Sequence, residues 1–217
     1  MIRDGGVQRM LIESGAAAEV LSEEALAASR RDLLGDDPPA GPVWVFGYGS
    51  LIWNPAFHYS EQCIGVVNGY HRQFCLWTHL GRGSPDCPGL VLGLERGGSC
   101  RGVAFRMAPE DAAHELEILW RREMVTGAYL PRWVTVRAGD RRVRAIAFTI
   151  NRAHGRYAGR LDEAQIVEVL ATAAGRLGPC ADYLFNTVRH LDELGLPDRP
   201  LRRLAVRVAE RLGRAAT

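Results

Sequence analysis

Two stretches of the sequence hold residues whose type and spacing could do chemistry. In the first, VWVFGYGSLIWNP from Val43 to Pro55, Gly47-Tyr48-Gly49-Ser50 interrupts a strand-like apolar run, which then resumes at Leu51-Ile52. Glycine lets the backbone approach a neighbour closely and leaves its N–H groups unshielded by a side chain. The stretch is therefore either a tight turn in a core strand or a backbone cradle for an anion.

The second stretch, PEDAAHELEILWRREM, places one acid among apolar residues. At about 100° per residue, one helical face gathers Ala112, Leu116, Leu119 and Trp120. Glu123 falls in the middle of this face, whereas Glu115 and Glu117 lie at its margin or off it. Burial raises the pKa of a carboxyl group toward the range that suits general acid–base catalysis. A structural ion pair with Arg121, Arg122 or a barrel arginine explains the pattern equally well, as does emergence of Glu123 into solvent at the helix end.

Composition excludes several kinds of chemistry. All 27 basic residues are arginine, which excludes a Schiff-base lysine and the lysine of a phosphate-binding loop. Gly47-Tyr48-Gly49 fails the dinucleotide fingerprint, because its third glycine would fall on Ile52. The five cysteines and six histidines show no metal-ligand spacing. We expect the cysteines to be small core residues or free thiols in a reducing cytoplasm, with a nucleophilic role for one of them as the alternative.

Charge and hydropathy also narrow the partners. The formal net charge of +2 does not favour nucleic acid, and no run of 18 apolar residues favours a membrane span. The N-terminal sequence contains acids and no sustained apolar core, so it does not resemble a signal peptide. We therefore expect no nucleic acid and no membrane as partners, and the sequence makes no prediction of the oligomeric state.

Short strands dominate from Val43 onward. Runs with strand character are 43–47, 62–67, 70–77, 89–95, 101–107, 132–138 and 142–150. A hairpin turn is expected at Ala138-Gly139-Asp140, between the last two. So many short strands suggest a small barrel, which leaves no exposed edge.

Helices follow or interrupt these strands, which makes the fold class α+β. They are expected at 109–124, 162–177, 181–194 and 200–212, and a glycine ends each of the last three. Residues 1–40 are expected to form a helical extension that ends in the linker GDDPPAGP, packed on or tethered to a main domain at 41–217.

Several motifs together resemble one family. In chain order they are FGYGSLIWNP, GYHRQF, RGSPDCPGLVLGL, GGSCRGVAFR, LWRREM, GAY and DYLFNT. They closely resemble the ChaC-type γ-glutamylcyclotransferases over roughly Val43 to Leu204. The resemblance implies a small mixed β-barrel flanked by helices and a cofactor-free cleavage of glutathione to 5-oxoproline and Cys-Gly. It differs in detail where Met124 follows the glutamate and where Ala128 separates Gly127 from Tyr129.

The resemblance also assigns residues. By position it gives catalysis to Glu123 and binding of the γ-glutamyl group to Gly47, Tyr48, Gly49, Ser50, Leu51 and Ile52. Arg72 is a candidate for the glycyl carboxylate of the substrate or for Glu123 itself, with a solvated strand arginine as the alternative. Tyr129 could offer its hydroxyl to the substrate, or it could be a core-edge tyrosine whose hydroxyl is already bonded.

Other functions remain open at this stage. A cyclotransferase could act on other γ-glutamyl peptides or amines, which would change only the leaving group. A relative that binds a γ-glutamyl group without catalysis is a different class, although the presence of Glu123 argues against it.

Overall fold

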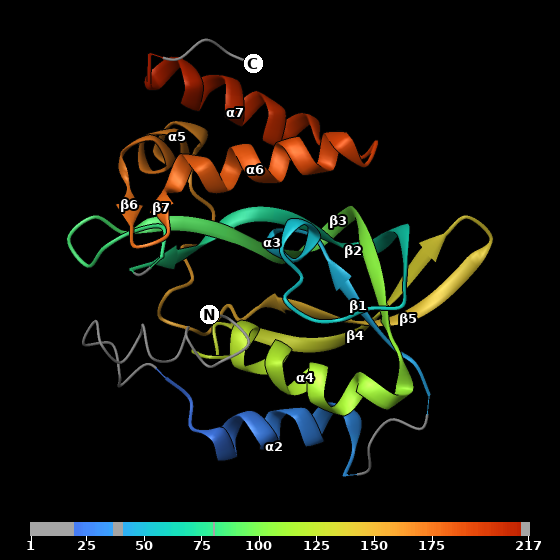
Figure 1. The fold of residues 1–217 in the computed structure, drawn as a ribbon. Helices are drawn as coiled ribbons and strands as arrows, with labels where there is room; N and C mark the ends of the chain where they lie inside the picture. Colours follow the sequence, from blue (N-terminus) through green and yellow to red (C-terminus); the bar gives the residue numbers. More distant parts are fainter. Residues whose placement is uncertain (1–19, 37–40, 80, 214–217) are drawn as a thin grey trace. The chain divides into compact units, whose positions relative to one another are not determined.

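The computed structural model describes residues 20–36, 41–79 and 81–213 and divides into two compact units (Figure 1). The first unit contains the described residues up to His71 together with Leu94–His154. The second contains Arg72–Gly93 and the described residues from Gly155 onward. Among the described helices, none combines the length and the apolar character needed to cross a lipid bilayer.

A closed five-stranded barrel confirms the predicted fold class. Its strands are β1 (Val43–Gly47), β2 (Glu61–Thr78), β3 (Gly89–Met107), β4 (Tyr129–Ala138) and β5 (Arg141–Ile150). The strand order is β1-β3-β2-β4-β5, and β1 closes the barrel by pairing in parallel with β5. The predicted turn at Gly139-Asp140 joins β4 to β5 as an antiparallel hairpin.

Two strands are longer than the sequence indicated. Runs 62–67 and 70–77 form the single strand β2, and runs 89–95 and 101–107 form the single strand β3. Glycine explains both differences, because Gly69, Gly97 and Gly98 adopt positive φ inside these strands. A glycine in that conformation bends a strand without ending its pairing.

The first unit buries its core between β1, β5 and helix α4 (Pro109–Glu123). β1 is buried along its whole length, and Phe148 of β5 is fully buried. Trp120 of α4 is also fully buried, and its ring meets that of Phe148 edge-on at 5.4 Å between centroids. Pro109 occupies the first turn of α4, as predicted. The helix therefore presents its last turn at a fixed position beside the barrel.

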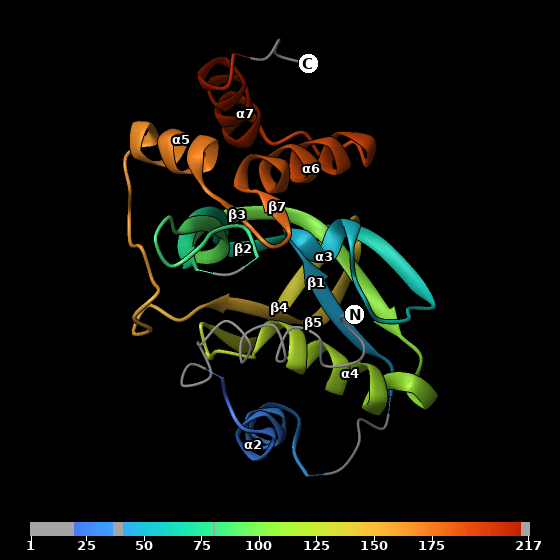
Figure 2. The same cartoon turned by 60° about the vertical axis from the view of Figure 1, so that its left-hand side comes forward.

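Helix α2 (Glu23–Leu34) is the described part of the predicted N-terminal extension, and it lies beside α4 (Figures 1 and 2). Ser22 caps it by accepting a hydrogen bond from the Ala25 N–H. The indole of Trp120 donates to Ser29 at 3.3 Å, and Arg121 pairs with Glu23 at 3.1 Å. Residues 1–19 and 37–40 lie outside the described residues, so the predicted boundary at residue 40 stays a prediction.

The second unit contains helices α5 (Glu163–Thr172), α6 (Cys180–Glu193) and α7 (Arg199–Arg211). The prediction that α5 continues to 177 is wrong. Two-residue strands β6 (Ala174–Gly175) and β7 (Gly178–Pro179) pair there as a hairpin. Gly175 approaches the Gly83 carbonyl so closely that an added Cβ would lie 2.4 Å from its oxygen. A helix with side chains does not allow this approach.

Candidate active site

At the end of β1, the glycine stretch packs closely against neighbouring residues. A Cβ added at Gly47 would lie 3.0 Å from the Phe105 ring and 3.2 Å from the Leu51 Cβ. Across the pairing, a Cβ at Gly102 would lie 2.4 Å from the Gly47 carbonyl oxygen. These glycines therefore serve a close backbone approach, and the cradle for an anion stays a prediction.

The chain then turns into the four-residue helix α3 (Ser50–Trp53). The Ile52 N–H donates to the Gly49 carbonyl at 2.9 Å, so this turn already engages one of the amides predicted to receive the substrate. The Tyr48 side chain is buried in the core, where its hydroxyl donates to the Phe148 carbonyl at 2.8 Å. Any contact of Tyr48 with a ligand must therefore come from its backbone.

Glu123 is the last residue of α4, and its side chain is only 13% exposed. The prediction that it faces inward is confirmed. Burial raises the pKa of the Glu123 carboxyl above its ordinary value, while the charge and the hydrogen bond of Arg122 oppose that shift. The upward direction of this pKa shift is the one that suits a general acid–base group.

Arg122 joins Glu123 to the glycine stretch. Its Nε lies 2.9 Å from Glu123 Oε1, and its other nitrogens donate to Ser50 Oγ at 3.1 Å and to the Asn54 carbonyl. One guanidinium group therefore spans from the buried carboxylate to both ends of α3. The sequence indicates Arg122 only as a possible ion-pair partner of Glu123, because its contact with Ser50 joins residues 72 positions apart.

The prediction that Glu123 is the only inward acid of α4 is wrong. Glu115 is 2% exposed and accepts a hydrogen bond from the His58 N–H at 3.1 Å. The segment after α3, which carries His58, covers the margin of the helical face where Glu115 lies. The apolar pattern of α4 alone does not predict that another segment of the chain buries Glu115.

The remaining predicted residues have distinct surroundings. Arg72 pairs with Asp198 at 3.2 Å and its side chain is 5% exposed, so the alternative of a solvated strand arginine is wrong. Both residues belong to the second unit. Tyr129 begins β4 in the first unit, where it pairs with Ile150 and is partly exposed. Substrate contacts of Arg72 and Tyr129 stay predictions.

We also searched the described residues for candidate metal ligands and for a reactive cysteine. Residues 20–36, 41–79 and 81–213 contain no cluster of three or more histidine, cysteine, aspartate or glutamate side chains that could hold a metal ion. The five cysteines, all within the described residues, form no disulfide, and burial raises the pKa of the Cys180 thiol to about 11. A thiol with that pKa is a poor nucleophile at neutral pH.

Comparison with solved structures identifies the fold of this protein. The fold matches that of a yeast crystal structure described as a gamma-glutamyl cyclotransferase specific to glutathione, with a TM-score of 0.72 at 21% identity. The match covers 82% of this chain and 99% of the yeast chain. The protein therefore has a gamma-glutamylcyclotransferase-like fold.

The family follows from sequence. The ChaC-like protein family matches residues 43–211, and the chain belongs to it. The "Glutathione-specific gamma-glutamylcyclotransferase" of Escherichia coli K12 is 44% identical over 201 residues, which covers 91% of this chain and 87% of that protein. The human "Glutathione-specific gamma-glutamylcyclotransferase 1" is 35% identical, with 69% of each chain covered.

Proposed function

We propose that this protein is a γ-glutamylcyclotransferase, a lyase that cleaves glutathione to 5-oxoproline and Cys-Gly without a cofactor. One observation carries the proposal: the buried carboxylate of Glu123 is joined through Arg122 to Ser50 of the glycine stretch. The names of the Escherichia coli and human relatives support the same substrate. The five cysteines form no disulfide within the described residues, which is consistent with the reducing cytoplasm that we propose as the compartment.

The α-carboxylate of the γ-glutamyl group would bind at the glycine stretch. Backbone N–H groups of Tyr48 to Leu51 are the proposed donors, and the positive charge of Arg122 beside Ser50 favours an anion there. This arrangement would bring the α-ammonium group of the same substrate to Glu123.

Glu123 would then act first as a base and next as an acid. Its carboxylate accepts a proton from the α-ammonium group, and the free amine attacks the γ-carbonyl carbon of the same molecule. A new C–N bond closes the five-membered lactam, and the bond to the cysteinyl nitrogen breaks. Glu123 passes two protons to that nitrogen in turn, the one from the α-ammonium group and the one that the attacking nitrogen loses as it becomes the lactam N–H, so Cys-Gly leaves with an ammonium group and no water is consumed. An intramolecular attack needs few catalytic groups, because the reacting groups are already close together and little entropy is lost in bringing them together.

Replacement of the base tests this mechanism. We expect Glu123→Gln to lower kcat by about 10²- to 10⁴-fold, the usual contribution of a positioned general base, while glutathione still binds. The measurement is 5-oxoproline release by chromatography, with glutathione binding by calorimetry. Glu117→Gln is the matched control, because Glu117 lies on the same helix, pairs with Arg121 and is 39% exposed. Near-normal turnover in Glu123→Gln would remove Glu123 from the mechanism.

The two alternatives have separate signatures. Equal rates of 5-oxoproline release from glutathione and from γ-glutamyl-alanine would favour a general γ-glutamyl cyclotransferase. Thermal stabilisation by glutathione without 5-oxoproline would favour a binding protein that does not catalyse the reaction.

A further inference from the structure

A cavity of about 260 Å³ lies in the barrel unit where β3, β4 and β5 meet. Its walls include Glu95 and Arg96 of β3, Leu130 and Arg132 of β4, and Arg152 after β5. Pockets for drug-sized ligands measure about 300–1,000 Å³, so this cavity suits a part of a small molecule.

The cavity adjoins the segment that follows Glu123. Leu130, in its wall, comes directly after Tyr129, and Tyr129 pairs with Ile150, which also lines the cavity. Asn151, another wall residue, donates from its backbone to the Ala128 carbonyl at 2.9 Å and from its side chain to the Gly127 carbonyl at 3.0 Å. The turn between Glu123 and β4 is therefore bonded directly to the wall of the cavity.

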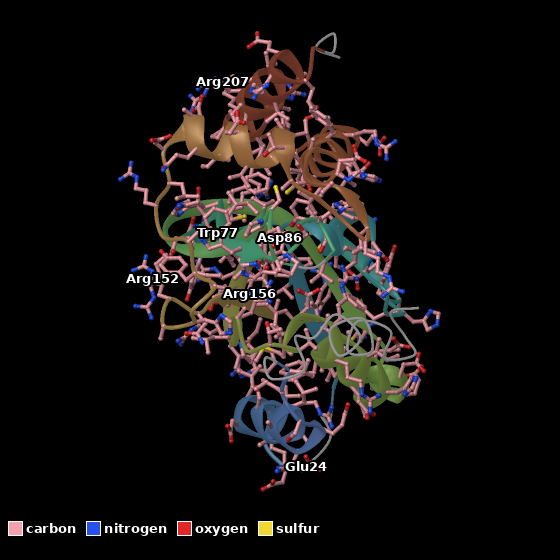
Figure 3. All side chains as sticks on the ribbon, turned by 90° about the vertical axis from the view of Figure 1, so that its left-hand side faces the viewer. Glu24, Trp77, Asp86, Arg152, Arg156 and Arg207 are labelled. Atoms are coloured by element: carbon pink, nitrogen blue, oxygen red, sulfur yellow. The ribbon has the colours of Figure 1, made fainter. Side chains whose placement is uncertain are left out.

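The wall of the cavity carries excess positive charge. Glu95 is 3% exposed and is its single carboxylate, against three arginines. Arg152 donates to Glu95 Oε1 from Nε at 2.8 Å and from its terminal nitrogen at 2.7 Å, and the Arg96 N–H donates to the same oxygen. The Arg152 side chain, labelled in Figure 3, is 54% exposed, so the pair joins a buried acid to the surface.

Among the described residues, the other two arginines of the wall have no ion pair of the kind that Arg152 makes with Glu95. Arg96 and Arg132 are exposed, and the described part of the chain places no carboxylate within ion-pair distance of either guanidinium. The backbone of Arg132 has a fixed position, because it pairs with Ala147 inside the β4–β5 ladder. Arg132 and Leu130 are two residues apart on one strand, so they share a face, and both line the cavity.

We propose that this cavity is the subsite for the leaving dipeptide, and that Arg132 binds its C-terminal carboxylate. The inference rests on the proposed function, because it concerns the part of glutathione that does not become 5-oxoproline. A γ-glutamyl group held at the glycine stretch and Glu123 requires the rest of the substrate to extend away from them. A guanidinium group binds a carboxylate through two parallel charge-assisted hydrogen bonds. The cavity thus makes Arg132 a specificity-determining residue for substrates that end in a carboxylate.

The test compares glutathione with its C-terminal amide, which has the same shape and lacks the negative charge. We expect the wild-type protein to prefer glutathione by about tenfold or more in kcat/KM, the value of one hydrogen bond to a charged group. In Arg132→Gln the ratio of the two kcat/KM values should approach one, because KM for glutathione rises while kcat changes little. Arg137→Gln is the matched control, since Arg137 is exposed on the same strand and lies outside the cavity wall.

The outcomes separate the subsite from the reaction. Formation of 5-oxoproline at equal efficiency from both substrates would overturn the subsite and leave the proposed function intact. A preference that survives in Arg132→Gln and disappears in Arg72→Gln would assign the carboxylate to Arg72 and overturn Arg132. Failure of the wild-type protein to form 5-oxoproline from either substrate would refute the proposed function and the subsite together.

Discussion

Arg122 acts on both Glu123 and helix α3. Its charge lowers the pKa of Glu123, while burial of the same carboxyl raises it. Its hydrogen bonds to Ser50 and to the Asn54 carbonyl hold α3 next to the end of α4. A buried carboxylate that had no such partner would stay protonated at neutral pH and could not accept a proton.

We expect Arg122→Gln to move the acid limb of the kcat/KM profile to higher pH. The base works as a carboxylate, so activity falls as the pH drops through the pKa of Glu123. Removal of the neighbouring positive charge leaves burial unopposed and raises that pKa, so the fall begins at a higher pH. The measurement is kcat/KM for glutathione between pH 4 and pH 9.

Arg121→Gln is the control for this prediction. Arg121 is 33% exposed and pairs with Glu23 and Glu117, away from Glu123. Its variant should keep the wild-type profile. An unshifted acid limb in Arg122→Gln would contradict the role that we give to Arg122.

At the scale of elements, glycines set how closely the strands approach each other. β1 and β3 meet where Gly47 pairs with Val103 and where Gly102 lies against the Gly47 carbonyl. The candidate loop begins at that carbonyl, so the packing of two strands fixes where the loop starts.

We expect Gly102→Ala to destabilise the protein by about 1–3 kcal/mol, the usual result of overpacking a core. The added methyl group would lie 2.4 Å from the Gly47 oxygen and 2.7 Å from the Phe46 ring, so the start of the loop must move. Urea unfolding gives the stability, and 5-oxoproline release should fall as well. In Gly155→Ala, where a Cβ meets no atom within 4 Å, both values should stay near those of the wild type. A fully active Gly102→Ala would separate the loop from this strand contact.

Helix α2 behaves as a part of the barrel unit rather than as a loose appendage. The Leu21 N–H donates to the Val125 carbonyl at 2.8 Å, and the Trp133 indole donates to the Leu33 carbonyl at 3.1 Å. Val125 follows Glu123 by two residues, so α2 supports the segment that carries the candidate base.

We expect Leu26→Ala to lower the free energy of unfolding by about 2–5 kcal/mol, as for other large-to-small changes in a core. Leu26 is 2% exposed, and its truncation leaves a void between α2 and its neighbours. Asp32→Ala, at an exposed position of the same helix, should change the stability little. A small effect of Leu26→Ala on urea unfolding would favour the looser tethering that the sequence also allowed.

For the molecule as a whole, the exclusive use of arginine has a chemical consequence. The sequence contains no lysine, so the chain's only possible amine is its own α-amino group. In the proposed reaction the attacking amine belongs to the substrate. Positive charge in the second unit also comes from arginine, as where Arg156 donates to the Trp77 carbonyl at 2.8 Å (Figure 3).

We therefore expect turnover to survive treatment with an amine-acylating ester. The protein would be acylated, treated with hydroxylamine to remove esters from tyrosine, and assayed for 5-oxoproline release. Loss of most of the activity after acylation alone would contradict a mechanism in which the substrate supplies the only reacting amine.

The sequence by itself determined features that depend on neighbours along the chain. The bounds of β1, the start of α4 at Pro109 and the inward direction of Glu123 follow from apolar periodicity and local signals, and all are confirmed. The glycine stretch was also recognisable, because its composition departs from that of the strand around it.

Only the tertiary structure decided which distant groups meet. Arg122 reaches Ser50, Arg72 pairs with Asp198, and the segment that carries His58 covers Glu115. Each contact joins parts of the chain far apart in sequence, and helical or strand periodicity does not specify such pairs. Burial and partner charge set whether a carboxyl group can serve as a base, and both depend on what the rest of the chain packs against it.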